Sequence, residues 1–320
     1  MKEVQQFIEE ELKVFEKKFE TAVRADNAAL NQILKYVIKR KGKQLRPMFV
    51  FLCAKLFAPV NESTYRAAAL VEMLHTATLV HDDVVDEAYE RRGFFSINAL
   101  WKNKIAVLVG DFLLSKGLIL ATEHEEYQQL QLMSEAVRKM SEGELLQIQK
   151  ARHLNLDEEI YFEIIKNKTA SLLASACAIG ASSTTKEEEN IAKMKQFGEF
   201  TGIAFQIKDD LFDYKMQYAG KPSGNDIQEK KLTLPLIHAL NNAPKAQKKS
   251  MIYILKNQNK DKKKVKQIID EVIQLGGVDH AEKIMLEYSN KAIEILHTFP
   301  NSKTRSSLEQ LVRYTTERVY

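Results

Sequence analysis

Two aspartate-rich segments have residue types and spacing suited to binding divalent cations. Residues 82–86 (DDVVD) and 209–213 (DDLFD) share the pattern DDxxD, and both lie in strongly helical sequence. Positions four apart share one face of an α-helix, so the outer aspartates project in pairs: Asp82 with Asp86, and Asp209 with Asp213. Paired carboxylates repel one another unless a cation neutralises them. Because Mg²⁺ prefers carboxylates and substrate phosphates, the segments predict a cleft that holds a polyphosphate through metal ions.

Basic side chains near these segments predict a second anion site. The three basic clusters are Lys43 with Arg46, Arg91 with Arg92, and Lys221 with Lys231. Arginine binds phosphate bidentately and lysine acts as a point charge. Any one cluster, or either acidic segment alone, could be a solvated surface patch. Their occurrence together favours two anionic substrates, one held through metal and the other held directly by side chains.

Four further polar side chains extend the predicted site. His75 precedes the first acidic segment and lies close to the helical face of its outer aspartates, although an ordinary core histidine is the alternative. Lys168-Thr169 precedes a run of small residues, where close helix packing is the alternative. Gln206 lies one turn before Asp210. Thr169 and Gln206 could line a cavity without acting as competing bases.

The composition predicts an all-α fold with a single domain over residues 1–320. Only 12 glycines and 6 prolines occur, long apolar-periodic stretches dominate, and no succession of short alternating strands is present. The 45% hydrophobic content suffices for a sizeable core. No low-complexity linker divides the chain. The expected helices cover roughly 4–23, 28–39, 47–57, 63–87, 105–122, 127–151, 158–181 and 186 onward.

Net charge and cysteine content indicate which classes of partner and which cellular compartment to expect. The net charge of +4 is modest and its basic residues are dispersed, which argues against a nucleic-acid partner. Cys53 and Cys177 lie among apolar or small residues, as buried free thiols in a reducing compartment do. No secretory signal is evident, and the apolar stretch 105–121 carries Asp111 and Lys116, which disfavours a transmembrane span. We therefore expect a cytoplasmic protein.

The acidic and basic residues belong to a longer ordered series of segments. They are Gly42-Lys43-Gln44-Leu45-Arg46-Pro47, His75 through Gly93, Gly110-Asp111, Lys168-Thr169, Phe205 through Asp213, Lys221-Pro222 with Gly224 and Asp226, and Leu232-Thr233-Leu234-Pro235. The series resembles that of the trans-isoprenyl diphosphate synthases (polyprenyl synthetases), and most of all their long-chain, octaprenyl-type members. It spans most of the chain. The family's Gly-Gly-Lys opening is Lys41-Gly42-Lys43 here, which affects loop shape more than charge.

The resemblance implies an orthogonal helical bundle around a central cavity, a homodimer, and two substrates, isopentenyl diphosphate and an allylic diphosphate. It implies three Mg²⁺ per active site, with Mn²⁺ as a substitute. The implied metal ligands are Asp82, Asp86, Asp209 and Asp213. The implied allylic diphosphate site contains Arg91, Lys168, Thr169, Gln206, Lys221 and Lys231. The implied isopentenyl diphosphate site contains Lys43, Arg46, His75 and Arg92. The implied catalytic residues are Asp82, Asp86, Asp209, Lys168 and Gln206.

The implied reaction is ionisation, condensation and elimination. Mg²⁺ and basic side chains stabilise the departing diphosphate. The isopentenyl double bond then attacks the allylic cation, and a proton passes to the released diphosphate. No Ser-His-Asp or Cys-His arrangement is evident in the sequence, which agrees with a mechanism that needs no protein nucleophile.

Ala77 and Thr78 are the predicted determinants of product length. In the family, aromatic residues at this level stop growth at short products, and neither residue is aromatic. We therefore expect an all-trans product longer than farnesyl, about C25 to C40. Another bulky side chain closing the tunnel earlier is the alternative, and it would give farnesyl or geranylgeranyl diphosphate. The exact length, the primer and transient membrane contact during product release are left open.

Three other classes of protein compete with this interpretation. A class I terpene cyclase usually pairs DDxxD with an Asn/Ser/Glu-type second motif and needs no isopentenyl site, whereas this chain has DDLFD, Lys43 and Arg46. A non-catalytic partner subunit commonly loses acidic residues, and this chain keeps both sets. A generic helical interaction protein is favoured least.

We predict that Asp82→Ala greatly reduces turnover and leaves the fold intact, because it removes a carboxylate from the proposed metal site. The measurement is an Mg²⁺-dependent condensation assay, with circular dichroism as the control for folding. Wild-type rates in this variant would remove Asp82 from the mechanism.

Overall fold

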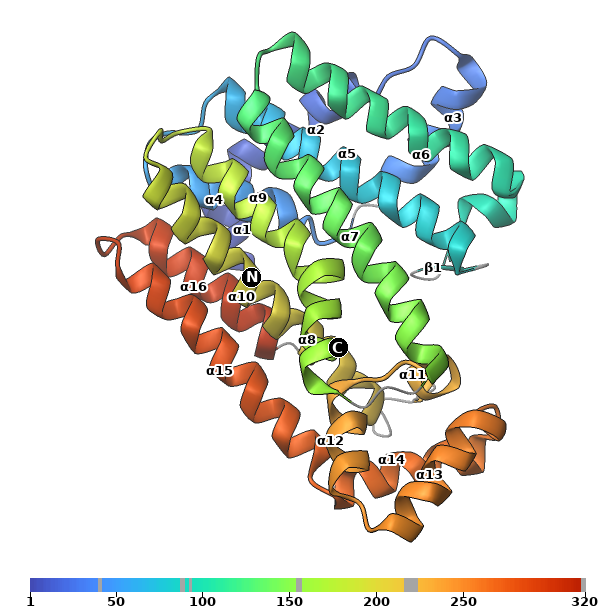
Figure 1. Ribbon diagram of the computed structural model, residues 1–320. Coiled ribbons are helices and arrows are strands. Elements are labelled where there is room, and N and C mark those ends of the chain that lie inside the picture. The colour runs from blue at the N-terminus through green and yellow to red at the C-terminus, as the bar shows by residue number, and fades with distance from the viewer. Residues whose placement is uncertain (40–41, 87–89, 92–93, 154–156, 216–223, 318–320) are drawn as a thin grey trace. The chain divides into compact units, whose positions relative to one another are not determined.

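The computed structural model describes residues 1–39, 42–86, 90–91, 94–153, 157–215 and 224–317, and this part of the chain is almost entirely helical (Figure 1). The first helices are α1 (Lys2–Phe7), α2 (Glu9–Ala22), α3 (Ala28–Lys39), α4 (Leu45–Lys55), α5 (Glu62–Val85), α6 (Ile97–Glu123) and α7 (Tyr127–His153). The remaining ones are α8 (Glu158–Ile165), the π-helical turn η1 (Lys166–Ala170), α9 (Ser171–Ser182), α10 (Glu188–Lys215), α11 (Asn225–Gln228), α12 (Leu234–Asn242), α13 (Lys245–Asn257), α14 (Lys262–Gln274), α15 (Gly277–His297) and α16 (Lys303–Glu317).

The described residues contain one pair of very short strands, β1 (Glu90–Arg91) and β2 (Phe94–Phe95). They are antiparallel, with Glu90 opposite Phe95. This pair is too small to alter the fold class. The all-α prediction is therefore confirmed.

The chain forms two compact units. Unit 1 comprises residues 1–137, 174–195 and 300–308, and unit 2 comprises residues 138–173, 196–299 and 309–320. Each unit is described by itself. A single domain over the whole chain stays a prediction.

The core of unit 1 is built around α4 and α5. All residues of α4 from Pro47 to Ala54 are buried, as expected for an almost wholly apolar helix. A capping box fixes the start of α5, because the Asn61 side chain accepts a hydrogen bond from the Thr64 backbone N–H and the Thr64 hydroxyl accepts one from the Asn61 N–H. Apolar residues then fill the buried face of α5. These two helices carry the first acidic segment and the Lys43/Arg46 cluster.

Close backbone contact holds α9 against α4 within unit 1. A Cβ atom built on Gly180 would stand 2.4 Å from the Val50 carbonyl oxygen. Cys53 and Cys177 lie at the same seam, both buried and both free thiols, as the sequence predicted. Burial, with hydrogen bonding to Cys53, raises the pKa of the Cys177 thiol well above its ordinary value. This keeps Cys177 protonated and unreactive.

The core of unit 2 gathers around α12. Leu234, Leu236, Ile237 and Leu240 of α12 are fully buried with residues of α8, α10, α14 and α15. Helix α12 contacts α8, α14 and α15. Pro235 occupies the first turn of α12. Backbone N–H groups have no acceptor within the helix there, so the N–H that proline lacks costs no hydrogen bond. These helices position the second acidic segment, which lies on α10.

Three expected helices differ from those observed. The expected helix over 158–181 is divided by η1, which separates α8 from α9. The expected helix over 4–23 breaks at Ile8 into α1 and α2, and its buried apolar residues are Val4, Ile8, Phe15, Phe19 and Val23. The helix expected at 105–122 begins earlier, at Ile97, and contains a non-helical residue, Lys102, at φ 68°.

Helix α6 is the one helix in the described residues that is long and apolar enough to cross a membrane. The most apolar part of this helix is 33% buried. One such helix is weak support for a membrane span, because core helices of soluble proteins have the same length and composition. Packing of α6 along α5 in unit 1 accounts for its buried side (Figure 1).

We predict that Gly180→Ala lowers the free energy of unfolding by about 1–3 kcal/mol, because the added methyl group must displace the α4 backbone. Gly117→Ala is the matched control. A Cβ there would meet only Leu70 Cδ1, at 3.1 Å, which is the end of a flexible side chain. Urea unfolding should show Gly117→Ala within about 1 kcal/mol of wild type. Equal stability of the two variants would contradict the close packing of α9 on α4.

Candidate active site

The first acidic segment lies at the C-terminal end of α5. Asp82 is half-buried in the last turn, and Asp86 is the exposed C-cap residue, whose N–H donates to the Asp82 carbonyl oxygen at 2.8 Å. Asp83 is buried instead, with Asn98 donating to its carbonyl oxygen. A helix C-terminus carries partial negative charge. The carboxylates of Asp82 and Asp86 are therefore repelled both by one another and by the helix end. Their hard oxygen atoms fit a divalent cation such as Mg²⁺.

The Lys43/Arg46 cluster lies at the opposite kind of helix end, the N-terminus of α4. Gln44 adopts a left-handed conformation at φ 50° and, as N-cap, makes no side-chain cap hydrogen bond. Its side chain instead donates to Glu16 Oε1 at 3.3 Å. No acidic residue occupies the first turn. Exposed Lys43 and half-buried Arg46 therefore add positive charge to the positive end of a helix, which suits an anion.

A hydrogen bond joins the α4 N-terminus to α5. Arg46 Nη1 lies 2.8 Å from His75 Nε2. Guanidinium is always a donor, so His75 must accept through Nε2 and carries its proton on Nδ1. The structure thus brings these two predicted site residues together. Whether His75 also contacts substrate stays a prediction.

The predicted determinants of product length lie on the same helix, α5. Ala77 is fully buried, and Thr78 is half-buried. The Thr78 hydroxyl donates to the His75 carbonyl oxygen at 2.9 Å, within its own helix. The Thr78 hydroxyl is therefore satisfied within α5.

In unit 2 a chain of hydrogen bonds organises the second acidic segment. Thr169 Oγ1 donates to Gln206 Oε1 at 2.8 Å, and Gln206 Nε2 donates to Asp210 Oδ1 at 2.9 Å. Tyr161 donates to Asp210 Oδ2 at 2.7 Å. Thr169 and Gln206 are thus brought together as expected. Asp210 is the buried anchor of the segment, whereas neighbouring Asp209 is half-buried.

Burial, reinforced by the charge of Asp226, raises the pKa of Asp210 to about 7, against the lowering effect of the bonds from Tyr161 and Gln206. An aspartate in the unfolded chain ionises near pH 3.8. Between these pH values Asp210 therefore holds a proton in the folded protein that it lacks in the unfolded chain. The contribution of Asp210 to stability falls as the pH rises from about 4 to about 7.

The π-helical turn η1 places Lys168 and Thr169 between two glycines of unit 2. A Cβ on Gly143 of α7 would stand 2.9 Å from the Lys168 backbone nitrogen, and one on Gly202 of α10 would stand 2.6 Å from Ala170 Cα. Lys168 Nζ pairs with Glu144 Oε2 at 2.5 Å. Single π turns often occur at functional sites. The small residues therefore allow the close approach that fixes Lys168.

Asp213, the last residue of the second segment, binds backbone donors. Its Oδ1 accepts from the N–H groups of Gly224 and Asn225, and its Oδ2 accepts from that of Asp226, all at 2.9–3.0 Å. A carboxylate offers about four lone-pair sites, so its role as a metal ligand stays a prediction. Lys231 Nζ contacts Glu229 at 2.6 Å and Asp226 at 3.5 Å.

Several predicted residues are not brought together by the structure. Arg92 and Lys221 lie outside the described residues, and Arg91 is described only as a backbone position of β1. Asp82 and Asp86 belong to unit 1, whereas Asp209 and Asp213 belong to unit 2. That the two segments face one another stays a prediction.

Sequence reasoning missed two residues that support the site. Tyr161 lies in an apolar helix, 49 residues from its partner Asp210, so no local pattern marks it. Glu144, the partner of Lys168, resembles any other charged residue of α7 in the sequence. Both contacts arise only from helix packing.

Comparison with known proteins covers nearly the whole chain. The sequence pattern of the family described as polyprenyl synthetase matches residues 27–272. Octaprenyl diphosphate synthase of Escherichia coli (strain K12) is 34% identical over 300 residues, covering 92% of each chain. Heptaprenyl diphosphate synthase component 2 of Bacillus subtilis (strain 168) is 31% identical over 318 residues, covering 98% of this chain and 90% of that one.

A solved structure of a polyprenyl synthase is also similar to this chain. The polyprenyl synthase from Caulobacter crescentus CB15, complexed with calcium and isoprenyl diphosphate, superposes with a TM-score of 0.90. It is 31% identical, and the match covers 98% of this chain and 97% of that one. The predicted fold type is confirmed.

We predict that Tyr161→Phe destabilises the protein by about 1–3 kcal/mol, because the buried Asp210 carboxyl loses a hydrogen-bond partner. Tyr214→Phe is the matched control, since Tyr214 is equally buried but bonds the neutral hydroxyl of Thr233 at 2.7 Å. Urea unfolding at pH 7.5 should show a loss of about 1 kcal/mol in the control. A smaller loss in Tyr161→Phe than in Tyr214→Phe would contradict the anchoring role of Asp210.

Proposed function

This chain belongs to the polyprenyl synthetase family, and we propose that it condenses isopentenyl diphosphate with an allylic diphosphate to give a medium- or long-chain all-trans-polyprenyl diphosphate. Its relatives include enzymes named for octaprenyl and heptaprenyl products. Members of the family are prenyltransferases that use divalent metal. Mg²⁺, with three ions per site, is the finer proposal for this chain.

The observation that carries the proposal is the charge placement within unit 1. Arg46, with Lys43, adds positive charge to the N-terminus of α4, and Asp82 with Asp86 adds negative charge to the C-terminus of α5. Both placements oppose the helix macrodipoles. The Arg46–His75 hydrogen bond links the two helices. These helix ends would stabilise a bound anion at α4 and a bound cation at α5, which is what a metal–diphosphate substrate pair supplies.

The residues of this chain have separate tasks in the reaction. Lys43 and Arg46 hold the isopentenyl diphosphate, and neutral His75 orients Arg46. Asp82, Asp86 and Asp209 would hold divalent cations, which when bound stabilise negative charge on diphosphate oxygens. In unit 2, Lys168 and the Thr169–Gln206 pair bind the allylic diphosphate.

The bonds made and broken follow from these charges. The allylic carbon–oxygen bond breaks with its electron pair going to the diphosphate. The isopentenyl double bond supplies the pair that forms the new carbon–carbon bond. The proton lost in restoring the double bond goes to the released diphosphate, the strongest base that the reaction itself provides.

Helix α5 supports a product longer than farnesyl. Ala77 is buried and small, and Thr78 has no bulky group to end chain growth. Farnesyl or geranylgeranyl diphosphate remains the shorter alternative, which the product analysis below distinguishes.

A homodimer is the proposed assembly. Five large apolar side chains of α6 are exposed in this single chain: Leu100, Val107, Leu108, Leu118 and Ile119. Such a stripe on one helix fits burial against a second copy. The name "component 2" of one relative raises the alternative that a different subunit is required for activity.

The test is incubation of the purified chain alone with radiolabelled isopentenyl diphosphate, Mg²⁺ and allylic primers, with chromatography of the products. We expect linear products beyond farnesyl, loss of activity with chelator, and twice the 36.7 kDa chain mass by light scattering. Arg46→Gln should raise KM for isopentenyl diphosphate at least about tenfold, because a charged hydrogen bond is worth roughly 1.5–3 kcal/mol. Lys249→Gln, a change at an exposed residue of α13, is the control.

Other outcomes reject specific parts of the proposal. Cyclic products would indicate a terpene cyclase. Inactivity of the folded chain with every primer would favour the subunit alternative. An unchanged KM in Arg46→Gln would remove the α4 N-terminus from substrate binding.

A further inference from the structure

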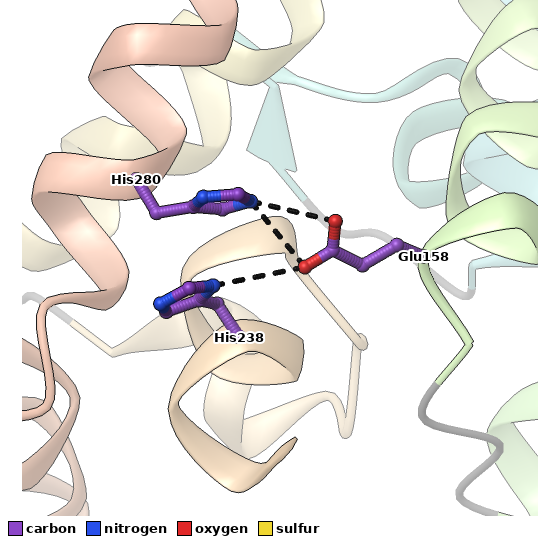
Figure 2. A group of neighbouring side chains, drawn as sticks. All are labelled: Glu158, His238 and His280. Atoms are coloured by element: carbon purple, nitrogen blue, oxygen red, sulfur yellow. Dashed lines mark hydrogen bonds and ion pairs between the residues drawn. The ribbon is translucent and has the colours of Figure 1, made fainter. Parts of the chain in front are cut away.

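Unit 2 contains a cluster of two histidines and one glutamate apart from both acidic segments (Figure 2). Glu158 begins α8, His238 lies on α12, and His280 lies on α15. One ligand atom from each lies within 4.8 Å of the other two. Figure 2 shows a ring nitrogen of each histidine directed at the Glu158 carboxylate. Three separate helices thus converge on one point.

We propose that Glu158, His238 and His280 form a binding site for a divalent transition metal ion, with Zn²⁺ as the best fit. His280 Nε2 lies 3.3 Å from Glu158 Oε1, and His238 Nδ1 lies 3.8 Å from the same oxygen. Ligands about 2.0–2.1 Å from a tetrahedral zinc ion stand about 3.3–3.4 Å apart. The three side chains therefore approach that spacing already. Two imidazoles and one carboxylate are a known zinc ligand set that leaves a fourth position for water.

Direct bonding accounts for only part of the cluster, because His280 Nε2 bonds Glu158 Oε2 at 3.4 Å while His238 lies farther away. The 3.8 Å from His238 Nδ1 to Glu158 exceeds the 2.7–3.2 Å of an N–H···O hydrogen bond. The two rings are stacked, with centroids 4.0 Å apart and planes at 17°. Two imidazolium ions at that separation would repel each other. A metal ion binds both rings in their neutral form and removes the repulsion.

The cluster is accessible from solvent. All three side chains are a quarter to a third exposed, at 34% for Glu158, 26% for His238 and 25% for His280. An ion can therefore reach them from solvent.

The nitrogen ligands separate this site from the acidic segments. Mg²⁺ prefers oxygen ligands, whereas imidazole suits Zn²⁺ and its neighbours. Bound zinc would tie the start of α8 to α12 and α15. Tyr161, three residues along α8 from Glu158, donates to Asp210. The ion would thus stabilise the helix that anchors the second acidic segment, without contacting substrate.

The test is titration of the chelator-treated full chain with Co²⁺ in excess Mg²⁺, which occupies the carboxylate sites. We expect one Co²⁺ per chain with the visible absorption of tetrahedral coordination, displaced by one equivalent of Zn²⁺, and a higher Tm with Zn²⁺. Loss of an outer partner of a metal ligand weakens binding about 10- to 100-fold. His238→Gln and His280→Gln remove ligands themselves, so each should weaken Zn²⁺ binding at least tenfold and abolish the absorption.

His297→Gln is the matched control. His297 also lies on α15 and pairs with a glutamate, Glu309, at 3.3 Å, but among the described residues it belongs to no group of three possible metal ligands. This variant, and Asp82→Ala, should keep the cobalt spectrum. Absence of the spectrum in the wild-type protein overturns the proposal, and so does its persistence in either folded ligand variant. A spectrum lost in Asp82→Ala would place the ion at the acidic segment instead.

Discussion

Carboxylates at the C-terminal end of a helix repel one another and also oppose the helix macrodipole, and α5 ends with such a pair in Asp82 and Asp86. The N-terminus of α4 has the converse arrangement, with Lys43 and Arg46 at the positive end of a helix. Neither helix can move to reduce this unfavourable interaction between charge and helix dipole, because eight consecutive residues of α4 and the packed face of α5 are buried. Rigid packing in unit 1 therefore holds these charges at helix ends, where a bound ligand of opposite charge would be stabilised.

Unit 2 holds its acidic segment in a different way, through a series of side-chain hydrogen bonds. Thr169, Gln206, Asp210 and Tyr161 bond in sequence across η1, α10 and α8. Each of these four polar side chains has a hydrogen-bond partner, which is the condition for such a network to stabilise a core. Asp210 takes the bonds from Gln206 and Tyr161, and this leaves adjacent Asp209 as the carboxylate more accessible to a cation.

The features that depend on local periodicity and motif spacing, such as helix bounds, were predicted well from the sequence. The bounds of α3 at 28–39 agree with those expected, and α7 differs only at its end. The π turn at Lys166–Ala170 was not foreseen, because its wider hydrogen-bonding pattern leaves the apolar period of the surrounding helices nearly unchanged. The contacts of Arg46 with His75 and of Thr169 with Gln206 link residues whose roles had been expected. Tyr161 and the Glu158–His238–His280 cluster depend on helices distant in the chain, which no local pattern specifies.

The three backbone bonds to Asp213 give the second acidic segment a structural duty beyond ligand binding. Its carboxylate anchors the first residues of α11, at Gly224, Asn225 and Asp226. A cation that recruited Asp213 would compete with these amides for the same lone pairs. Occupancy and the tethering of α11 are then thermodynamically linked, and the coupling is reciprocal: each weakens the other by the same free energy. Unlike the fixed pair on α5, this carboxylate would act as an exchangeable tether.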